Sequence, residues 1–279
     1  MSENAQTREK SSSSVDMGQF GPAMAQMPTS EEKIEAPYPL DDAHMSEQLD
    51  FYKAATGIQD PEKLKAQIYE IRTEGCKAFP FPCVLFRHPF YQNVRNEIEN
   101  KTATRKIFID IGAGMGTDLR QIIYHGWNRN DVLAVEIAPE WKPLGYKLFR
   151  DSDRPIPYFI GNVLESKVLD TTTSAQGDVN QVDLHSLEDL NPLKGTARFI
   201  TLNQLFHFFD EEGQRQLAKR CALLLSNDAG STIFGMQVGG VQKGVESYHK
   251  TFVHSPQVAR PYTVSTGPLL ESEEDNEMT

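Results

Sequence analysis

Apolar residues gather in five runs along the middle of the chain, with polar or helix-like segments between them. Short runs of this kind, bounded by turn residues, are typical of strands buried inside a parallel sheet. We expect strands at residues 107–111, 131–136, 156–160, 198–202 and 230–238. Because helical patterns lie between them, the sequence predicts an α/β fold, a doubly wound parallel sheet of the Rossmann-like type.

Helices are expected between these strands and ahead of the first one, where apolar residues recur every three or four positions. Asp60 and Pro61 form an N-cap followed by proline at the first helical position, and Gly75 supplies a stop. Asp210 is expected to cap a later helix. The expected helices cover residues 60–75, 88–99, 117–125, 139–150 and 210–225, and the polar stretch 171–183 is expected to be a loop.

The turn after the first strand contains three glycines at alternate positions. Such glycines allow a sharp turn and the close approach of a ligand, toward which the next helix points its N–H groups. A dinucleotide fingerprint would need its third glycine at Thr117, which disfavours a nicotinamide-dependent oxidoreductase. The spacing instead resembles the turn of S-adenosylmethionine-dependent methyltransferases. We therefore expect Asp110, Gly112, Gly114 and Gly116 to bind that cofactor.

Further positions at strand ends suit a nucleoside. Glu136 ends the second strand, 20 residues after Gly116, where a carboxylate can accept hydrogen bonds from both ribose hydroxyls. Asn162 and Val163 follow the third strand and are expected to bind the cofactor, with Asn162 offering a donor and an acceptor to adenine. Trp141, in the helix after the second strand, either walls the adenine pocket or belongs to the core.

The segment after the fourth strand is the expected place for the methyl acceptor. Asn203 and Gln204 are expected to line the transfer site, and Asn203 to contact the cofactor. His207 is the candidate catalytic residue, either a base or a group that positions the acceptor. A hydrogen-bonded core histidine among phenylalanines is the competing interpretation. His254, on a loop near the same edge, is the second candidate.

The remaining segments define the domain organisation. Residues 1–45 are polar and without periodicity, which predicts a disordered tail. Residues 46–262 are expected to form one domain, with an N-terminal helical layer at 46–104 and the Rossmann-like core at 105–262. The helical layer either roofs a substrate pocket or packs on the sheet edge. Residues 263–279 are expected to form a disordered acidic tail.

Composition narrows the range of partners. The chain of 279 residues has 39% hydrophobic and 24% charged residues, enough for a substantial core. Its formal net charge is −11, and no Lys or Arg run stands out, which disfavours a nucleic-acid partner. Three cysteines without paired metal-ligand spacing suit a reducing compartment and indicate no metal site. Without a membrane-length apolar run or a signal peptide, the sequence predicts a cytoplasmic protein; a homodimer is left open.

Taken in order, these elements resemble methyltransferases of fungal natural-product pathways, notably meroterpenoid biosynthesis. The resemblance runs from about Thr56 to His254. It implies S-adenosylmethionine as cofactor and O-methylation of a small molecule, at a carboxylate or hydroxyl of a secondary metabolite such as a meroterpenoid intermediate. The motifs that carry it lie at residues 56–64, 81–83, 110–120, 144–149, 206–209, 223–225, 230–231 and 235–239.

One departure from this family concerns the far end of the chain. After residues 254–256, members usually continue through a helix and a final antiparallel strand pair. Residues 257–270 are too few for both, so we expect an incomplete C-terminal strand pair. A truncated, non-catalytic or regulatory protein with the same fold is therefore the alternative function.

Overall fold

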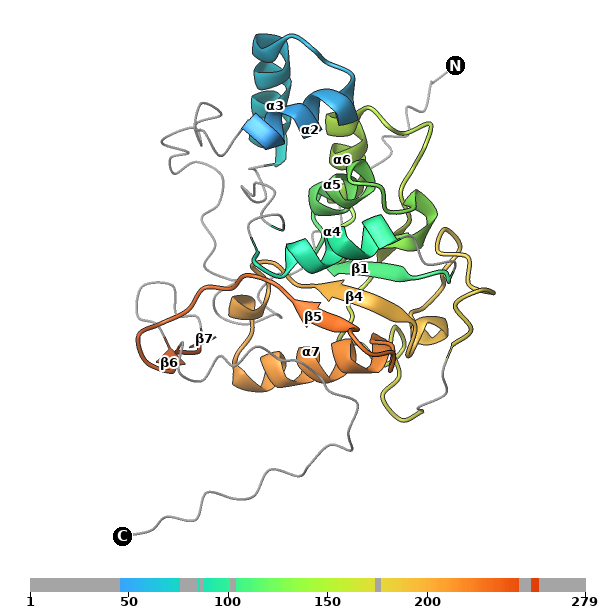
Figure 1. The fold of residues 1–279 in the computed structure, drawn as a ribbon. Helices are drawn as coiled ribbons and strands as arrows, with labels where there is room; N and C mark the ends of the chain where they lie inside the picture. Colours follow the sequence, from blue (N-terminus) through green and yellow to red (C-terminus); the bar gives the residue numbers. More distant parts are fainter. Residues whose placement is uncertain are drawn as a thin grey trace, which may run out of the picture.

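A five-stranded parallel sheet forms the centre of the computed structural model (Figure 1). β1 (Ile107–Ile111) lies between β2 (Val132–Glu136) and β4 (Ala197–Thr201), and β3 (Tyr158–Ile160) and β5 (Thr232–Phe234) are the outer strands. The order β3-β2-β1-β4-β5, with every pair parallel, confirms the predicted doubly wound α/β sheet. The strand order reverses between β1 and β4, and open α/β sheets bind ligands outside the carboxyl ends of strands at such a switch point.

The structure describes residues 46–75, 85, 88–100, 104–173, 177–245 and 252–255. The tails predicted at 1–45 and 263–279 lie outside this part of the chain, as do Cys76, Cys83 and nearly all of the extended apolar segment around them. Within the described residues, no helix is both long and apolar enough to span a membrane.

Apolar side chains leave both faces of the sheet, as the unbroken apolar runs predict. Phe108 packs with α4 (Tyr91–Asn100) and α5 (Thr117–Tyr124) on one face. Its neighbour Ile109 packs with α7 (Glu211–Leu224) on the other. Figure 1 shows α4 and α5 on one side of the strands and α7 on the opposite side. The glycine turn after β1 and the acid at the end of β2 therefore belong to a sheet whose two faces are both buried.

The N-terminal helical layer packs on other helices. α2 (Ser46–Thr56) and α3 (Pro61–Gly75) share an apolar cluster with α6 (Trp141–Phe149), in which Phe51 is fully buried. The predicted start of α3 is confirmed, because Asp60 Oδ1 accepts hydrogen bonds from the N–H groups of two residues in its first turn. The layer is thus joined to the helix that follows β2.

The connection between β3 and β4 departs from strict alternation of strands and helices. Its described residues contain only the 3-10 turn η5 (Asn191–Leu193), and loop residues such as Leu169 and Leu184 fill the apolar layer instead. Asp170 and Asp183 accept hydrogen bonds from backbone N–H groups two residues ahead, so local turns replace helical bonds there. A second 3-10 turn, η4 (Arg129–Asp131), leads into β2.

The last strands are shorter than the sequence predicts. We expected a strand over 230–238, whereas β5 covers three residues. Beyond Thr201 the two segments stay joined by backbone hydrogen bonds from Leu202 N to Phe234 O at 3.2 Å and from Gln204 N to Met236 O at 2.7 Å. The side chains of Asn203 and Gln237 add further bonds there. β6 (Gly244–Val245) and β7 (Phe252–Val253) form a separate antiparallel pair. Within the described residues this pair does not join the main sheet. The incomplete strand pair that we expected concerns the chain after residue 256, which lies outside the described residues.

Candidate functional site

The glycine turn connects the carboxyl end of β1 to α5, beside the switch point of the sheet. Gly112, Gly114 and Gly116 adopt positive φ angles of 78°, 52° and 67°. Residues with a Cβ atom rarely take this conformation, so the turn needs glycine at all three positions. A Cβ built on Gly114 would meet nothing within 4 Å. The backbone at Gly114 is therefore open to a ligand.

Neighbouring elements pack closely against the rest of this turn. A Cβ built on Gly116 would lie 2.6 Å from Tyr158 Oη of β3, and one built on Gly145 of α6 would lie 2.3 Å from the carbonyl oxygen of Met115. Real Cβ atoms do not come so close to other atoms. These two glycines thus let β3 and α6 support the turn directly.

Glu136, at the end of β2, is tied to the turn. Its Oε2 accepts a hydrogen bond from Gly114 N at 2.8 Å, and its Oε1 accepts from the N–H groups of Ile137 and Ala138 at 2.8 and 3.1 Å. Burial raises the pKa of this carboxyl, and the three N–H donors partly offset that shift. A carboxylate offers about four lone pairs. With three engaged here, one on Oε2 is left, and the predicted bonds from both ribose hydroxyls stay a prediction.

The predicted adenine contacts follow β3 as expected from the sequence. Asn162 Oδ1 accepts a hydrogen bond from Leu164 N at 3.0 Å, which forms a local turn. The side chain of Val163 is buried in the core beneath the sheet, so only its backbone can face a ligand. Trp141 at the start of α6 is buried, with 7% of its surface exposed. Contact of these residues with adenine stays a prediction.

Asp110 lies inside the sheet. Its Oδ1 accepts a hydrogen bond from Thr201 Oγ1 of β4 at 2.9 Å, which links the two strands that flank the switch point. Burial raises the pKa of Asp110 well above its usual range, and the nearby acids Asp118 and Glu136 add to this shift. Only 3% of the residue is exposed, and its part in cofactor binding stays a prediction.

Asn203 connects three chain segments at the carboxyl edge of the sheet. Its Nδ2 donates to Asp118 Oδ2 in the first turn of α5, and its Oδ1 accepts from Met236 N after β5, both at 3.0 Å. Asp118 Oδ1 also accepts from Leu85 N at 3.3 Å. Both ends of the Asn203 amide are thus engaged by protein, and its predicted contact with a cofactor stays a prediction.

Gln237 forms hydrogen bonds with the segment after β4, which is expected to face the acceptor. Gln237 Oε1 accepts hydrogen bonds from Leu205 N and Phe206 N at 3.0 and 2.9 Å, and its Nε2 donates to Leu202 O. Gln204, within this segment, has a φ of 53°, which is strained for a residue with a side chain. Such strain persists only where surrounding bonds enforce it, as Gln237 does here.

The two candidate histidines have different surroundings. His207 lies in the 3-10 turn η6 (Phe206–Phe208), half-buried, with its ring centroid 4.3 Å from that of Phe208. The Nε2 atom of His254 lies 3.1 Å from Gln214 Oε1 of α7, which ties it to a helix flank. His207 therefore stays the better placed candidate, on the segment that follows β4.

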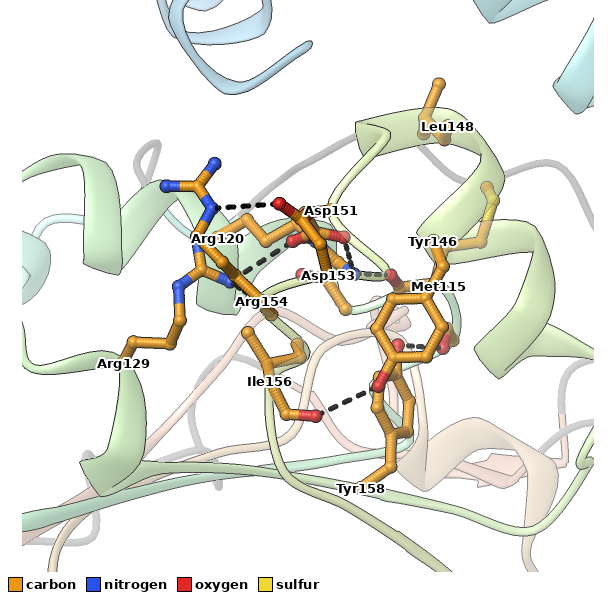
Figure 2. Close-up of polar contacts among 12 residues, drawn as sticks. Met115, Arg120, Arg129, Tyr146, Leu148, Asp151, Asp153, Arg154, Ile156 and Tyr158 are labelled. Atoms are coloured by element: carbon orange, nitrogen blue, oxygen red, sulfur yellow. Dashed lines mark hydrogen bonds and ion pairs between the residues drawn. The ribbon is translucent and has the colours of Figure 1, made fainter. Parts of the chain in front are cut away.

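A buried ion pair stands behind the glycine turn (Figure 2). Arg120 of α5 forms two hydrogen bonds with the Asp151 carboxylate, at 2.8 and 2.9 Å, and its Nη1 donates to the carbonyl oxygens of Met115 and Gly116 at 2.7 and 3.3 Å. Arg129 adds a second contact to Asp151 at 3.1 Å. The side chains of Arg120 and Asp151 are 2% and 3% exposed. One guanidinium thus holds two carbonyls of the turn.

This pair was missed by reasoning from the sequence. Charged residues on helices and loops are usually exposed, so Arg120 and Asp151 give no sign that they are buried together. The one available signal is that Arg120 ends the family-like motif at 110–120. For Tyr158, too, the sequence predicts only a place in a strand.

Several known proteins whose sequences are similar to this chain are fungal methyltransferases. The model of the meroterpenoid methyltransferase N-terminal domain matches residues 38–86. O-methyltransferase phiE of a fungal species (strain ATCC 74256) is 27% identical over 196 residues, covering 67% of this chain and 58% of the relative. Asnovolin E/Chermesin D methyltransferase nvfJ of Aspergillus novofumigatus is 28% identical over 178 residues, covering 60% and 56%. The predicted resemblance to fungal natural-product methyltransferases is confirmed.

The similarity has limits of length and of geometry. The chain spans somewhat more than half the length of the methyltransferases phiE and nvfJ. An S-adenosylmethionine-dependent methyltransferase of Leishmania major aligns with 74% of this chain and 75% of its own at 15% identity, with a TM-score of 0.39. That score is low, and the fold assignment rests on the parallel strand order itself.

Proposed function

We propose that this methyltransferase-like chain transfers a methyl group from S-adenosylmethionine to oxygen of a small secondary metabolite, such as a meroterpenoid intermediate. The observation that carries the proposal is the glycine turn at the switch point, with Gly114 N hydrogen-bonded to the carboxylate of Glu136. Relatives named O-methyltransferase and meroterpenoid methyltransferase support the same reaction class.

The residues present fit this cofactor. Gly114 leaves space where any other residue would place a Cβ, and Glu136 retains a lone pair for a ribose hydroxyl. We assign cofactor binding to Asp110, Gly112, Gly114, Gly116, Glu136, Asn162, Val163 and Asn203.

S-adenosylmethionine supplies a methyl group bonded to a positively charged sulfur, a good leaving group. As the acceptor oxygen forms its bond to the methyl carbon, the carbon–sulfur bond breaks and its electron pair stays on sulfur. Alignment of the reacting groups can contribute on the order of 7–11 kcal/mol. A carboxylate acceptor is ionised at neutral pH and needs no base. A hydroxyl acceptor must lose a proton, for which His207 is the proposed base.

Binding of the product cofactor tests the proposal. Calorimetry on the full chain should detect binding of S-adenosylhomocysteine. Glu136→Ala should weaken this binding at least tenfold, because the variant removes the carboxylate that accepts a hydrogen bond from the ribose. Glu140→Ala, an exposed acid in the same β2–α6 connection, is the control and should bind as the natural chain does. Absence of binding by the natural chain to both S-adenosylmethionine and S-adenosylhomocysteine would overturn the proposed function.

The setting of the reaction is also part of the proposal. We place this activity in one domain at residues 46–262, acting in the cytoplasm on a small molecule and without a nucleic-acid partner. The net charge of −11 supports the last point, because phosphate contacts need basic surfaces. Light scattering after size-exclusion chromatography would decide between a monomer and a homodimer.

A further inference from the structure

Tyr158 reaches from β3 to the backbone of the glycine turn. Its hydroxyl donates a hydrogen bond to the carbonyl oxygen of Gly114 at 3.1 Å (Figure 2). The side chain is partly buried, and burial raises the pKa of the phenol, so the hydroxyl keeps its proton and remains a donor. The hydroxyl is also the atom that a Cβ on Gly116 would meet at 2.6 Å. Tyr158 thus contacts the turn at two of its three glycines.

The peptide groups on both sides of Gly114 are held by side chains. The preceding peptide donates its N–H to Glu136 Oε2 at 2.8 Å, and the following peptide accepts from Tyr158 Oη at 3.1 Å. Gly114 itself has a φ of 52° and open space in place of a side chain. A glycine in this position can rotate easily, so the two hydrogen bonds decide its orientation.

Three consecutive carbonyl oxygens of the turn are engaged by side-chain donors. Tyr158 holds Gly114 O, and Arg120 holds Met115 O and Gly116 O. Arg120 is itself fixed by Asp151. Because each oxygen already has a donor from β3 or α5, the turn keeps one shape, and a ligand does not have to arrange it.

We propose that Tyr158 is a positioning residue for the cofactor, acting through Gly114 on Glu136. By holding Gly114 O, it keeps Gly114 N on Oε2 of Glu136 and so fixes the direction of the remaining carboxylate lone pair toward the ribose. This inference rests on the proposed function of the site. It predicts that an isosteric change at Tyr158, which removes only the hydroxyl that holds Gly114 O, weakens cofactor binding.

A pair of tyrosine variants tests this role. Tyr158→Phe should weaken S-adenosylhomocysteine binding about five- to tenfold, the loss expected from one hydrogen bond. Tyr146→Phe is the matched control, because its hydroxyl donates to Ile156 O at 3.1 Å in the same cluster and does not reach the turn. It should change binding less than twofold. Thermal melts of both variants establish that each is folded.

A double-mutant cycle distinguishes positioning from a general structural effect. If Tyr158 acts through Glu136, the variant with both Tyr158→Phe and Glu136→Gln should lose clearly less affinity than the product of the two single losses. Binding by Tyr158→Phe equal to the natural chain overturns the positioning role, as do equal losses in the two tyrosine variants or losses that multiply in the cycle. Failure of the natural chain to bind any cofactor overturns instead the proposed function.

Discussion

At the scale of single residues, two acidic side chains of the candidate site are buried and accept hydrogen bonds from backbone or hydroxyl donors. Asp110 and Glu136 are 3% and 8% exposed, and burial raises the pKa of both carboxyls. Thr201 Oγ1 donates to Asp110, and Gly114 N donates to Glu136. A carboxyl whose pKa differs between the folded and the unfolded protein makes the free energy of unfolding depend on pH.

Asp110→Asn should change how stability varies with pH. Between its ordinary range near pH 4 and its raised value, folded Asp110 retains a proton that the unfolded chain has released, so its contribution to stability falls as the pH rises through that window. Asparagine keeps an acceptor for Thr201 and does not titrate. The free energy of unfolding of the natural chain, minus that of the variant, should therefore decrease as the pH rises above about 4.

Urea unfolding at several pH values measures this difference. Asp153→Asn, which makes the same substitution at an exposed position, serves as the control. Parallel curves for the natural chain and Asp110→Asn would show that Asp110 titrates normally in the folded protein.

At the scale of elements, α6 and the glycine turn are in direct backbone contact. Gly145 lets the helix approach Met115, and a Cβ there would lie 2.3 Å from the Met115 carbonyl oxygen. The same oxygen accepts a hydrogen bond from Arg120 at 2.7 Å. Because the obstacle is backbone rather than a mobile side chain, any residue larger than glycine must push the helix away from the turn.

Gly145→Ala should destabilise the protein by about 1–3 kcal/mol, as overpacking does in other cores, and should also weaken binding of S-adenosylhomocysteine. Gly239→Ala provides a matched control, because its Cβ would lie at an ordinary 3.5 Å from His254 O. Chemical unfolding and calorimetry measure the two effects. A Gly145→Ala protein as stable as the Gly239→Ala protein would mean that α6 adjusts freely against the turn.

At the scale of the whole molecule, the N-terminal layer is packed into the rest of the domain. Phe51 is fully buried, with ring contacts to Tyr124 of α5 and Phe149 of α6 at 5.7 and 5.9 Å between centroids. Gln67 of α3 donates to Leu148 O of α6 at 2.8 Å. The helices ahead of the sheet therefore share their core with the helices that support the turn.

Phe51→Ala should lower the stability of the whole domain by about 3–5 kcal/mol, within a single cooperative transition. Val241→Ala, at a side chain that is 91% exposed, should leave stability unchanged. Thermal unfolding followed both by circular dichroism and by tryptophan fluorescence would show whether the two signals change together in a single transition at lower temperature. An early separate transition in Phe51→Ala, with the main transition unaltered, would show that the N-terminal layer folds as its own unit.

Local sequence signals predicted the parts of the molecule that depend on local physics. The apolar run before Gly112 and the cap at Asp60 predicted a strand and a helix start, and both are confirmed. Glu136 lies at the end of β2 as predicted and contacts the glycine turn. The Arg120–Asp151 pair and the bond from Tyr158 to Gly114 join residues that are 31 and 44 positions apart. Such contacts depend on tertiary packing, which residue type and spacing do not reveal.

The three-residue length of β3 and β5 has a consequence for behaviour in solution. They are the two outer strands, and within the described residues no further strand pairs with either of them. Long exposed edge strands offer rows of unpaired N–H and C=O groups that recruit other chains. Here each edge is too short to hold a foreign strand in register. The short edge strands therefore disfavour edge-to-edge aggregation of the sheet.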